Sequence, residues 1–268
     1  MSVRLMLSVS ALVVATTIAP AAGAQESRRD DAFSWSGRIP SGNTIRIHNI
    51  NGGIEVTRSS GSRVEVTGEK RWRRGDPDDV RIEQKSFGDD VVICALWTPG
   101  STCEERGIRS ERNSRNNNRN NDVSVRFVVR VPEGVRVALV TVNGGIEVRD
   151  VTTEVEARTV NGSITARSAG GPVRAHTVNG SIDVAMGSLG RADDLEYETV
   201  NGAITLELPS NFGAELELST VNGRVTTDFP ITVSGTLSPR KLRGTVGDGR
   251  TRVRASTVNG SVTLRRGR

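Results

Sequence analysis

Apolar and polar residues alternate along most of this 268-residue chain, and an Asn-Gly pair interrupts the alternation at intervals. Around Asn161, for example, apolar residues stand six and four positions upstream (Val155, Ala157) and three and five positions downstream (Ile164, Ala166). Alternation with a period of two predicts half-buried β-strands on both sides of a turn. No window after residue 24 shows a capped apolar stripe with a 3.6-residue period. The sequence therefore predicts an all-β protein.

The Asn-Gly pairs mark a repeated unit. The last six belong to the sequence Thr-Val-Asn-Gly, and their successive intervals are 18, 18, 22, 21 and 37 residues. We interpret the 37-residue interval as about two periods, and the 92 residues between the first two pairs as about five. A short unit that recurs at a fixed period predicts a solenoid, in which each coil stacks on its neighbour. The predicted corners of the coils are Asn51, Asn143, Asn161, Asn179, Asn201, Asn222 and Asn259.

Two architectures are compatible with a single unit. Asn-Gly between alternating apolar residues is a strong signal for a hairpin with a type I′ turn, so the units would form an antiparallel β-meander. In a β-solenoid, Asn in the left-handed conformation would turn the corner of each coil, and like residues would stack into ladders. The ladder explains the Thr two positions before Asn in six units, which a hairpin does not require. We favour a single-domain β-helix or β-solenoid with coils of about 18–22 residues.

One segment, Val131 to Val148, reads Val-Pro-Glu-Gly-Val-Arg-Val-Ala-Leu-Val-Thr-Val-Asn-Gly-Gly-Ile-Glu-Val and is followed by repeated Thr-Val-Asn-Gly-Ser-Ile. This pattern resembles the bacterial putative-adhesin family, whose members are extracytoplasmic β-helix-like domains of unknown function. The resemblance covers most of the chain after residue 24 and is best from Val123 onward. It implies a β-helix-like fold and an adhesin-like role, and it brings no catalytic or ligand-binding residues with it.

The first 24 residues are typical of a secretory signal peptide. Arg4 supplies a positive region, Leu5 to Ile18 is apolar, and Ala22-Gly23-Ala24 forms a small-residue cleavage site. We expect an exported protein in the periplasm, at the cell surface or outside the cell. The remaining chain divides into a polar leader (25–31) and one solenoid domain (32–268), composed of an irregular N-terminal cap region (32–98), an Arg/Asn-rich loop (99–122) and regular coils (123–268).

The two cysteines flank a predicted turn, Trp97-Thr98-Pro99-Gly100. Residues at equal distances from the centre of a hairpin loop lie opposite each other, so Cys94 and Cys103 would face each other across a strand pair. In an oxidising compartment we expect a disulfide between them, worth about 2–3 kcal/mol for so short a loop.

Basic residues gather in two places. One is the Arg/Asn-rich stretch at 106–121, and the other is a cluster around Trp72 formed by Lys70, Arg71, Arg73 and Arg74. This cluster is the candidate anionic-ligand patch, and its partners would be envelope glycans or other anionic polymers. The formal net charge is only +5 and acidic residues are spread along the chain, which argues against nucleic acid as a partner.

No motif indicates catalysis, a metal or a cofactor. The acidic residues Glu147, Asp183 and Glu207 lie on different units and do not repeat as the fixed carboxylate pair that glycoside hydrolysis requires. His48 and His176 have no Cys or His at metal-ligand spacing. We therefore predict a protein that is not an enzyme and has no small-molecule substrate, with a polysaccharide-active β-helix enzyme as a remote alternative.

Two classes of function remain. The first is an adhesin-like module that binds cell-surface or envelope polymers, and it should lose affinity when Arg71, Arg73 and Arg74 are replaced. The second is a structural envelope scaffold that associates with its own kind through the open ends of the solenoid, which present unpaired strand edges. A scaffold should show concentration-dependent association that does not depend on those arginines.

Overall fold

The computed structural model describes residues 32–110, 121–188, 194–233 and 238–267, and its strands form two large sheets and one small one. The expected signal peptide, the polar leader and residues 111–120 of the Arg/Asn-rich stretch lie outside these ranges. Within them, one short 3-10 helix, η1 (Pro77–Asp79), is the only helical element. No helix in the described part of the chain is long and apolar enough to cross a membrane. The prediction of an all-β protein is confirmed.

We call the two large sheets sheet A and sheet B. The order of the described strands in sheet A is β1 (Ala32–Gly37), β4 (Val64–Arg71), β9 (Ser124–Val131), β3 (Ile54–Arg58), β11 (Ile146–Val151), β13 (Ile164–Ser168), β15 (Ile182–Met186), β17 (Ile204–Leu208), β23 (Val262–Arg266) and β19 (Val225–Thr227). The order in sheet B is β20 (Thr232–Val233), β21 (Lys241–Val246), β18 (Ala214–Asn222), β22 (Thr251–Asn259), β16 (Asp194–Asn201), β14 (Val173–His176), β12 (Val155–Arg158), β10 (Arg136–Val140), β2 (Thr44–His48), β6 (Asp90–Leu96) and β5 (Arg81–Phe87).

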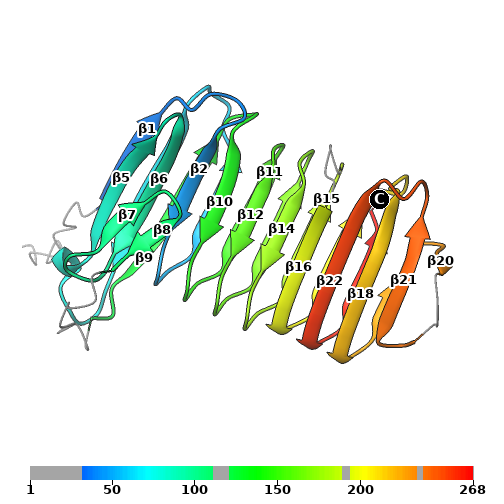
Figure 1. Cartoon of the computed structure of the whole chain (residues 1–268). Helices are drawn as coiled ribbons and strands as arrows, with labels where there is room; N and C mark the ends of the chain where they lie inside the picture. The colour runs from blue at the N-terminus through cyan, green and yellow to red at the C-terminus, as the bar shows by residue number, and fades with distance from the viewer. Residues whose placement is uncertain (1–31, 111–120, 189–193, 234–237, 268) are drawn as a thin grey trace, which may run out of the picture. The chain divides into compact units, whose positions relative to one another are not determined.

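Each coil contributes one strand to sheet B, turns at its Asn-Gly corner and contributes its next strand to sheet A. Thus β10, β12 and β14 lie side by side in sheet B, and β11, β13 and β15 follow them in sheet A (Figure 1). Neighbouring coils pair in parallel and in register, so that Ile146, Ile164 and Ile182 are aligned. Parallel pairing rules out the antiparallel meander and confirms the β-solenoid.

The hydrophobic core lies between the sheets and is built from the inward half of the alternation. Val155 and Ala157 of β12 and Ile164 and Ala166 of β13 are fully buried, whereas the residues between them reach the outer faces. The same positions of every coil supply the core, which is why successive coils repeat the same apolar spacing. Burial of this repeated apolar set drives the stacking of the coils.

Two intervals in the repeat differ from our interpretation. Asn51 forms a bridge directly with Asn143, so the 92 residues between them do not form five coils; they contain β3 to β10 instead. Nor does the 37-residue interval hold two periods. After Asn222 the chain forms β19 and then β20 and β21. Strand β21 pairs antiparallel with both β18 and β20, and the chain then runs back to form β22 and β23. Its last coil, β22–β23, lies between the coils β16–β17 and β18–β19.

Charge gives a physical reason for this order. The outward residues of β16 and β18 are acidic, and Glu196 and Glu217 would be adjacent if these strands paired in chain order. Arg254 of β22 lies between them in register, 3.8 Å from the Glu196 carboxylate and 3.5 Å from that of Glu217. Insertion of the basic strand therefore separates two acidic strands.

The short hairpin formed by β7 (Thr102–Glu104) and β8 (Gly107–Arg109) covers the outer side of β6. As a result, the outward-facing residues Val92, Cys94 and Leu96 of β6 are buried. They form a small cluster with Cys103. A disulfide joins Cys94 to Cys103, as predicted. The predicted pairing of the two residues across one strand pair is wrong, because Cys103 lies opposite Ile108 in the hairpin while Cys94 pairs within sheet B.

Candidate functional site

The corner asparagines stack into a ladder where the coils pass from sheet B to sheet A. The ladder runs in the order Asn51, Asn143, Asn161, Asn179, Asn201, Asn259 and Asn222. The Nδ2 group of each Asn after the first donates to the Oδ1 atom of the preceding one at 2.7–2.9 Å. The Thr two positions earlier in each of six coils donates to the corner Gly carbonyl of the neighbouring coil at 2.7–3.0 Å. In the first coil Asn49 takes this place and donates to Gly52 and Val125.

The corner conformation differs from the expectation of left-handed Asn. Among the described residues other than Gly, only Asp150 has a positive φ, so the left-handed Asn was wrong. The Gly that follows Asn is needed for a different reason. A Cβ atom on Gly162 would lie 2.1 Å from the Gly144 carbonyl oxygen of the neighbouring coil. The corner Gly therefore permits the close approach of successive coils.

The position after the corner Gly faces outward from sheet A. Backbone hydrogen bonds from the following residues align these positions into one row, which we call the first outward row. Its members, in the order of the stack, are Gly53, Gly145, Ser163, Ser181, Ala203, Ser261 and Arg224. Only the first two coils have glycine here.

A groove of about 500 Å³ lies over these two glycines. Arg71 at the end of β4 and Arg126 of β9 line it on one side, and Ser163, which directly precedes β13, lines the other. Glu55 and Glu147 also line it, and they are neighbours in register on β3 and β11. The groove therefore lies over β9, β3, β11 and β13 beside the end of β4, with bare backbone in the middle and charged side chains around it.

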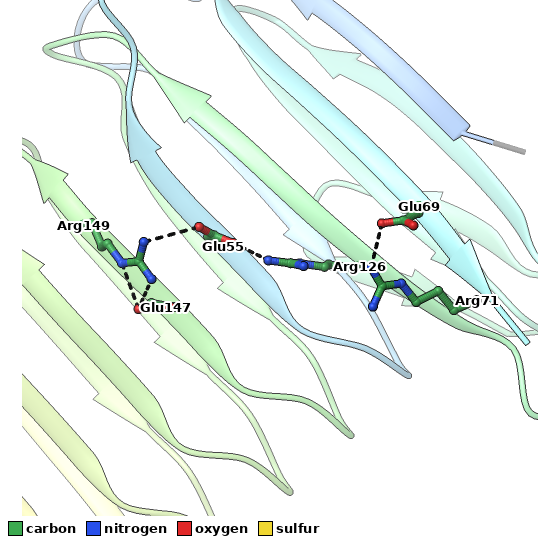
Figure 2. A network of polar contacts seen from close by, with 6 residues as sticks. All are labelled: Glu55, Glu69, Arg71, Arg126, Glu147 and Arg149. Carbon is green, nitrogen blue, oxygen red and sulfur yellow. Dashed lines mark hydrogen bonds and ion pairs between the residues drawn. The ribbon is translucent and has the colours of Figure 1, made fainter. Parts of the chain in front are cut away.

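An ion-pair network organises these charges (Figure 2). Arg126 donates to the Glu55 carboxylate at 2.6 Å, and Arg149 lies 3.7 Å from the same carboxylate. Arg149 also pairs with Glu147 at 2.6 Å, and this hydrogen bond raises the pKa of Arg149. Glu55 is only 22% exposed, so Arg126 and Arg149 neutralise a half-buried charge.

The groove residue Arg71 forms a further ion pair with Glu69 at 3.1 Å (Figure 2). Two arginines and two glutamates thus line the groove, Glu69 and Arg149 pair with them, and the formal charges of the six residues cancel. The groove offers fixed hydrogen-bond donors and acceptors without a net field of either sign.

The structure divides the basic patch predicted from the sequence. Of its four residues, Arg71 lines the groove. The Lys70 ammonium donates to the Pro77 carbonyl at 2.9 Å and so holds η1 against β4. The backbone N–H groups of Arg73 and Arg74 donate to the Asp122 carboxylate, and these bonds, chiefly that of Arg74, lower the pKa of Asp122. Of the four predicted residues, Arg71 alone therefore lines the groove.

Sequence reasoning missed Arg126, Glu55 and the glycine floor of the groove. A signal for the floor was present, because two units read Asn-Gly-Gly where the others continue with Ser, Ala or Arg. The partners Arg126 and Glu55 gave no signal, because they lie 71 residues apart in the chain and meet only through the pairing of β9 with β3.

The parallel coils, the paired sheets and the corner ladder define this chain as a β-solenoid protein. The sequence profile of the Toastrack DUF4097 family matches residues 133–265 of this chain. The resemblance to the putative-adhesin family is confirmed at the level of family and fold.

Two solved crystal structures are similar to this chain. One is described as "a putative cell adhesion protein" from Clostridium sporogenes, with 9% identity, a TM-score of 0.50 and coverage of 88% of this chain and 99% of that one. The other is "a putative adhesin" from Bacteroides fragilis, with 11% identity, a TM-score of 0.38 and coverage of 89% and 98%. No curated protein matches the sequence. At 9% identity, the likeness to the Clostridium sporogenes protein concerns the fold alone.

Proposed function

We propose that this chain is an exported, non-enzymatic, adhesin-like module that binds polymers of the cell surface or envelope through the outer face of sheet A. The observation that carries the proposal is the groove over Gly53 and Gly145, which is open, polar and ringed by arginine and glutamate side chains. A signal-peptide-like N-terminus supports export. The similar fold of a protein described as a putative cell adhesion protein supports the adhesin-like role.

The carboxylates of the groove do not favour a hydrolytic role. A general acid of a glycoside hydrolase needs a setting that keeps a carboxylic acid protonated near neutral pH, such as an apolar pocket. Glu55 contacts Arg126 and Arg149, and Glu147 contacts Arg149, so each of the two carboxylates is held by guanidinium groups. Such pairs suit the positioning of a bound ligand better than proton transfer to it.

A test begins with co-sedimentation of the purified chain with isolated envelope fractions across a salt series. We expect saturable binding that persists above about 0.5 M salt, where screened contacts between exposed charges are lost. Replacement of both Arg71 and Arg126 by Gln should weaken the binding. The matched control is the double variant Arg73→Gln/Arg74→Gln, which removes the same charge outside the groove and should bind like the wild type. Absence of saturable binding by the wild-type chain would contradict the proposed function.

One observation favours the scaffold as a second candidate. The valine before five of the corner asparagines projects to solvent: Val160, Val178, Val200, Val221 and Val258 are between 38% and 55% exposed. An apolar row of this kind beside the Asn ladder is a surface through which copies of the chain can associate. Sedimentation at increasing protein concentration distinguishes the candidates, because a scaffold forms oligomers without any envelope fraction and its assembly is weakened by Val178→Thr.

A further inference from the structure

We propose that the groove on sheet A takes a neutral, polyhydroxylated chain, namely a saccharide segment, laid across β9, β3, β11 and β13 with Gly53 and Gly145 as its floor. This inference rests on the proposed binding function and adds the class of ligand and the residues that admit it. Three features of the groove carry the inference: its glycine floor, the complete pairing of its strands and its balanced charge.

The glycine floor is not required by the backbone. Neither Gly53 nor Gly145 has a positive φ, so neither conformation reserves the position for glycine. A Cβ atom on either would lie 3.2 Å from a carbonyl oxygen of the next coil, which is a tight contact but not an overlap. Ser163 and Ser181 carry side chains at the next positions of the same row. The backbone and the packing of the coils would thus accept a small side chain at Gly53 and Gly145. The absence of one keeps the groove open.

The pairing of the strands excludes an extended peptide as an added strand. Each of β9, β3, β11 and β13 has a hydrogen-bonded neighbour on both sides in sheet A, so no strand edge is available inside the groove. Recognition of a peptide by strand addition needs such an edge. Among the described residues, no aromatic side chain lines the groove, and the larger apolar residues that line it, Ile54 and Ile146, point into the core. A ligand must therefore be recognised by its polar groups.

The balanced charge selects among polar ligands. A polyanion would approach Glu55 and Glu147, and a polycation would approach Arg71 and Arg126, so either would face like charges across the groove. A hydroxyl group both donates and accepts hydrogen bonds, whereas a guanidinium only donates and a carboxylate only accepts. A chain of hydroxyl groups is thus the partner that satisfies both kinds of side chain at once. Ser163 and Thr165 extend the same polar lining over β13.

The test uses envelope glycans released from the bacterium that produces the chain and separated by anion exchange into neutral and acidic fractions. Each fraction competes with whole envelopes for the purified chain in co-sedimentation. We expect the neutral fraction to compete and the acidic fraction not to. The double variant Gly53→Ser/Gly145→Ser should lose about tenfold or more in affinity, because filling a fitted site by small groups has effects of this size.

The matched control is Ala203→Ser, which adds the same hydroxyl to the same row of sheet A outside the groove. It should bind like the wild type. Thermal unfolding followed by circular dichroism verifies that the variants are folded. If the double Ser variant does not fold, the double variant Gly53→Ala/Gly145→Ala fills the floor with a smaller group. The same loss of affinity is expected for it.

The outcomes separate this inference from the function on which it rests. If the wild-type chain binds envelopes and the folded glycine variants bind equally well, the groove is not the site, although the binding function stands. Competition by the acidic fraction alone would overturn the neutral saccharide as the ligand. If the wild-type chain binds no envelope fraction, the proposed function itself fails.

Discussion

The two outer faces of this solenoid are built by the same coils, yet their outward side chains differ in kind. On sheet B, outward residues form rows of alternating charge. Arg252 of β22 lies 3.6 Å from Asp194 and 3.7 Å from Glu215, and Arg243 of β21 donates to Glu217 at 3.2 Å. On sheet A, the first outward row carries mostly glycine, serine and alanine. Both faces thus pair charged side chains, and sheet A differs in the small residues of its first outward row.

The difference continues at the N-terminal end of the parallel coils. There the β7–β8 hairpin and its disulfide cover the outer side of β6 in sheet B. On sheet A, the groove lies open over β3 and β11. Stacking fixes the inward residues and the corners of a coil but leaves the outward residues free to vary. A binding surface is therefore to be sought where small outward residues leave the backbone uncovered, which on sheet A is over Gly53 and Gly145.

The largest expected effect removes the framework that both faces share. In the variant Gly162→Ala, the new methyl group would overlap the Gly144 carbonyl oxygen at 2.1 Å, and the coils would have to separate. We expect a loss of unfolding free energy on the order of 3 kcal/mol, as for overpacked sites. Chemical denaturation measures it. The control Gly145→Ala places its Cβ atom 3.2 Å from the Ser163 oxygen and should cost much less. Equal losses for the two variants would refute the distinction between corner and floor glycines.

The sequence was sufficient for the parts of this framework that repeat. Alternating apolar residues predicted the strands, and the fixed Thr and Asn positions predicted stacked coils rather than hairpins. The same repetition hid the order of the coils, because the corners at Asn222 and Asn259 have the same Thr-Val-Asn-Gly sequence and fit either place in the ladder. The two coils differ in outward charge, since one carries acidic Glu217 and the other basic Arg254. This difference can indicate the order of the coils only when the neighbouring strands are known.

The groove was harder to predict for a related reason. Arg71 was singled out for its basic neighbours in sequence, but its place in the site depends on β9, which carries Arg126 and pairs with both β4 and β3. Long-range pairing of this kind leaves no local pattern. The inward positions repeat and are readable, whereas the outward positions that form a binding surface are particular to each coil.

The second effect tests the covered end of sheet B. His48 on β2 is buried, and burial, with a smaller contribution from Arg46, lowers its pKa from 6.5 to about 4. The unfolded chain therefore binds a proton at a higher pH than the folded one. The contribution of neutral His48 is complete above pH 6.5 and is lost as the pH falls towards 4, by roughly 2–3 kcal/mol. The difference in unfolding free energy between the wild type and His48→Gln, followed from pH 7 to pH 4, measures it. Titration of the His48 ring near pH 6.5 by NMR would contradict this account.

A smaller effect concerns the ladder that divides the two faces. Asn179 donates to Asn161 and accepts from Asn201, each at 2.8 Å, so Asn179→Ala interrupts the ladder at its middle. Because these groups are exposed, water replaces the lost partners, and we expect a cost of about 1 kcal/mol. Denaturant titration measures the loss. The control Val178→Thr alters the neighbouring exposed side chain without touching the amide ladder. A cost for Asn179→Ala no larger than that of the control would show that the ladder contributes nothing to stability.

The smallest expected effect lies on the outer face of sheet B, where Arg254 contacts both Glu196 and Glu217. All three side chains are partly exposed, and ion pairs in such settings contribute about 0.2–1 kcal/mol. We expect Arg254→Gln to lower the unfolding free energy by that amount at low salt and by less at 0.5 M salt, where the charges are screened. Envelope binding should stay at the wild-type level, since the row lies on sheet B and the groove on sheet A. If this variant kept its stability but lost envelope binding, the assignment of the binding surface to sheet A would be wrong, because sheet B would then carry it.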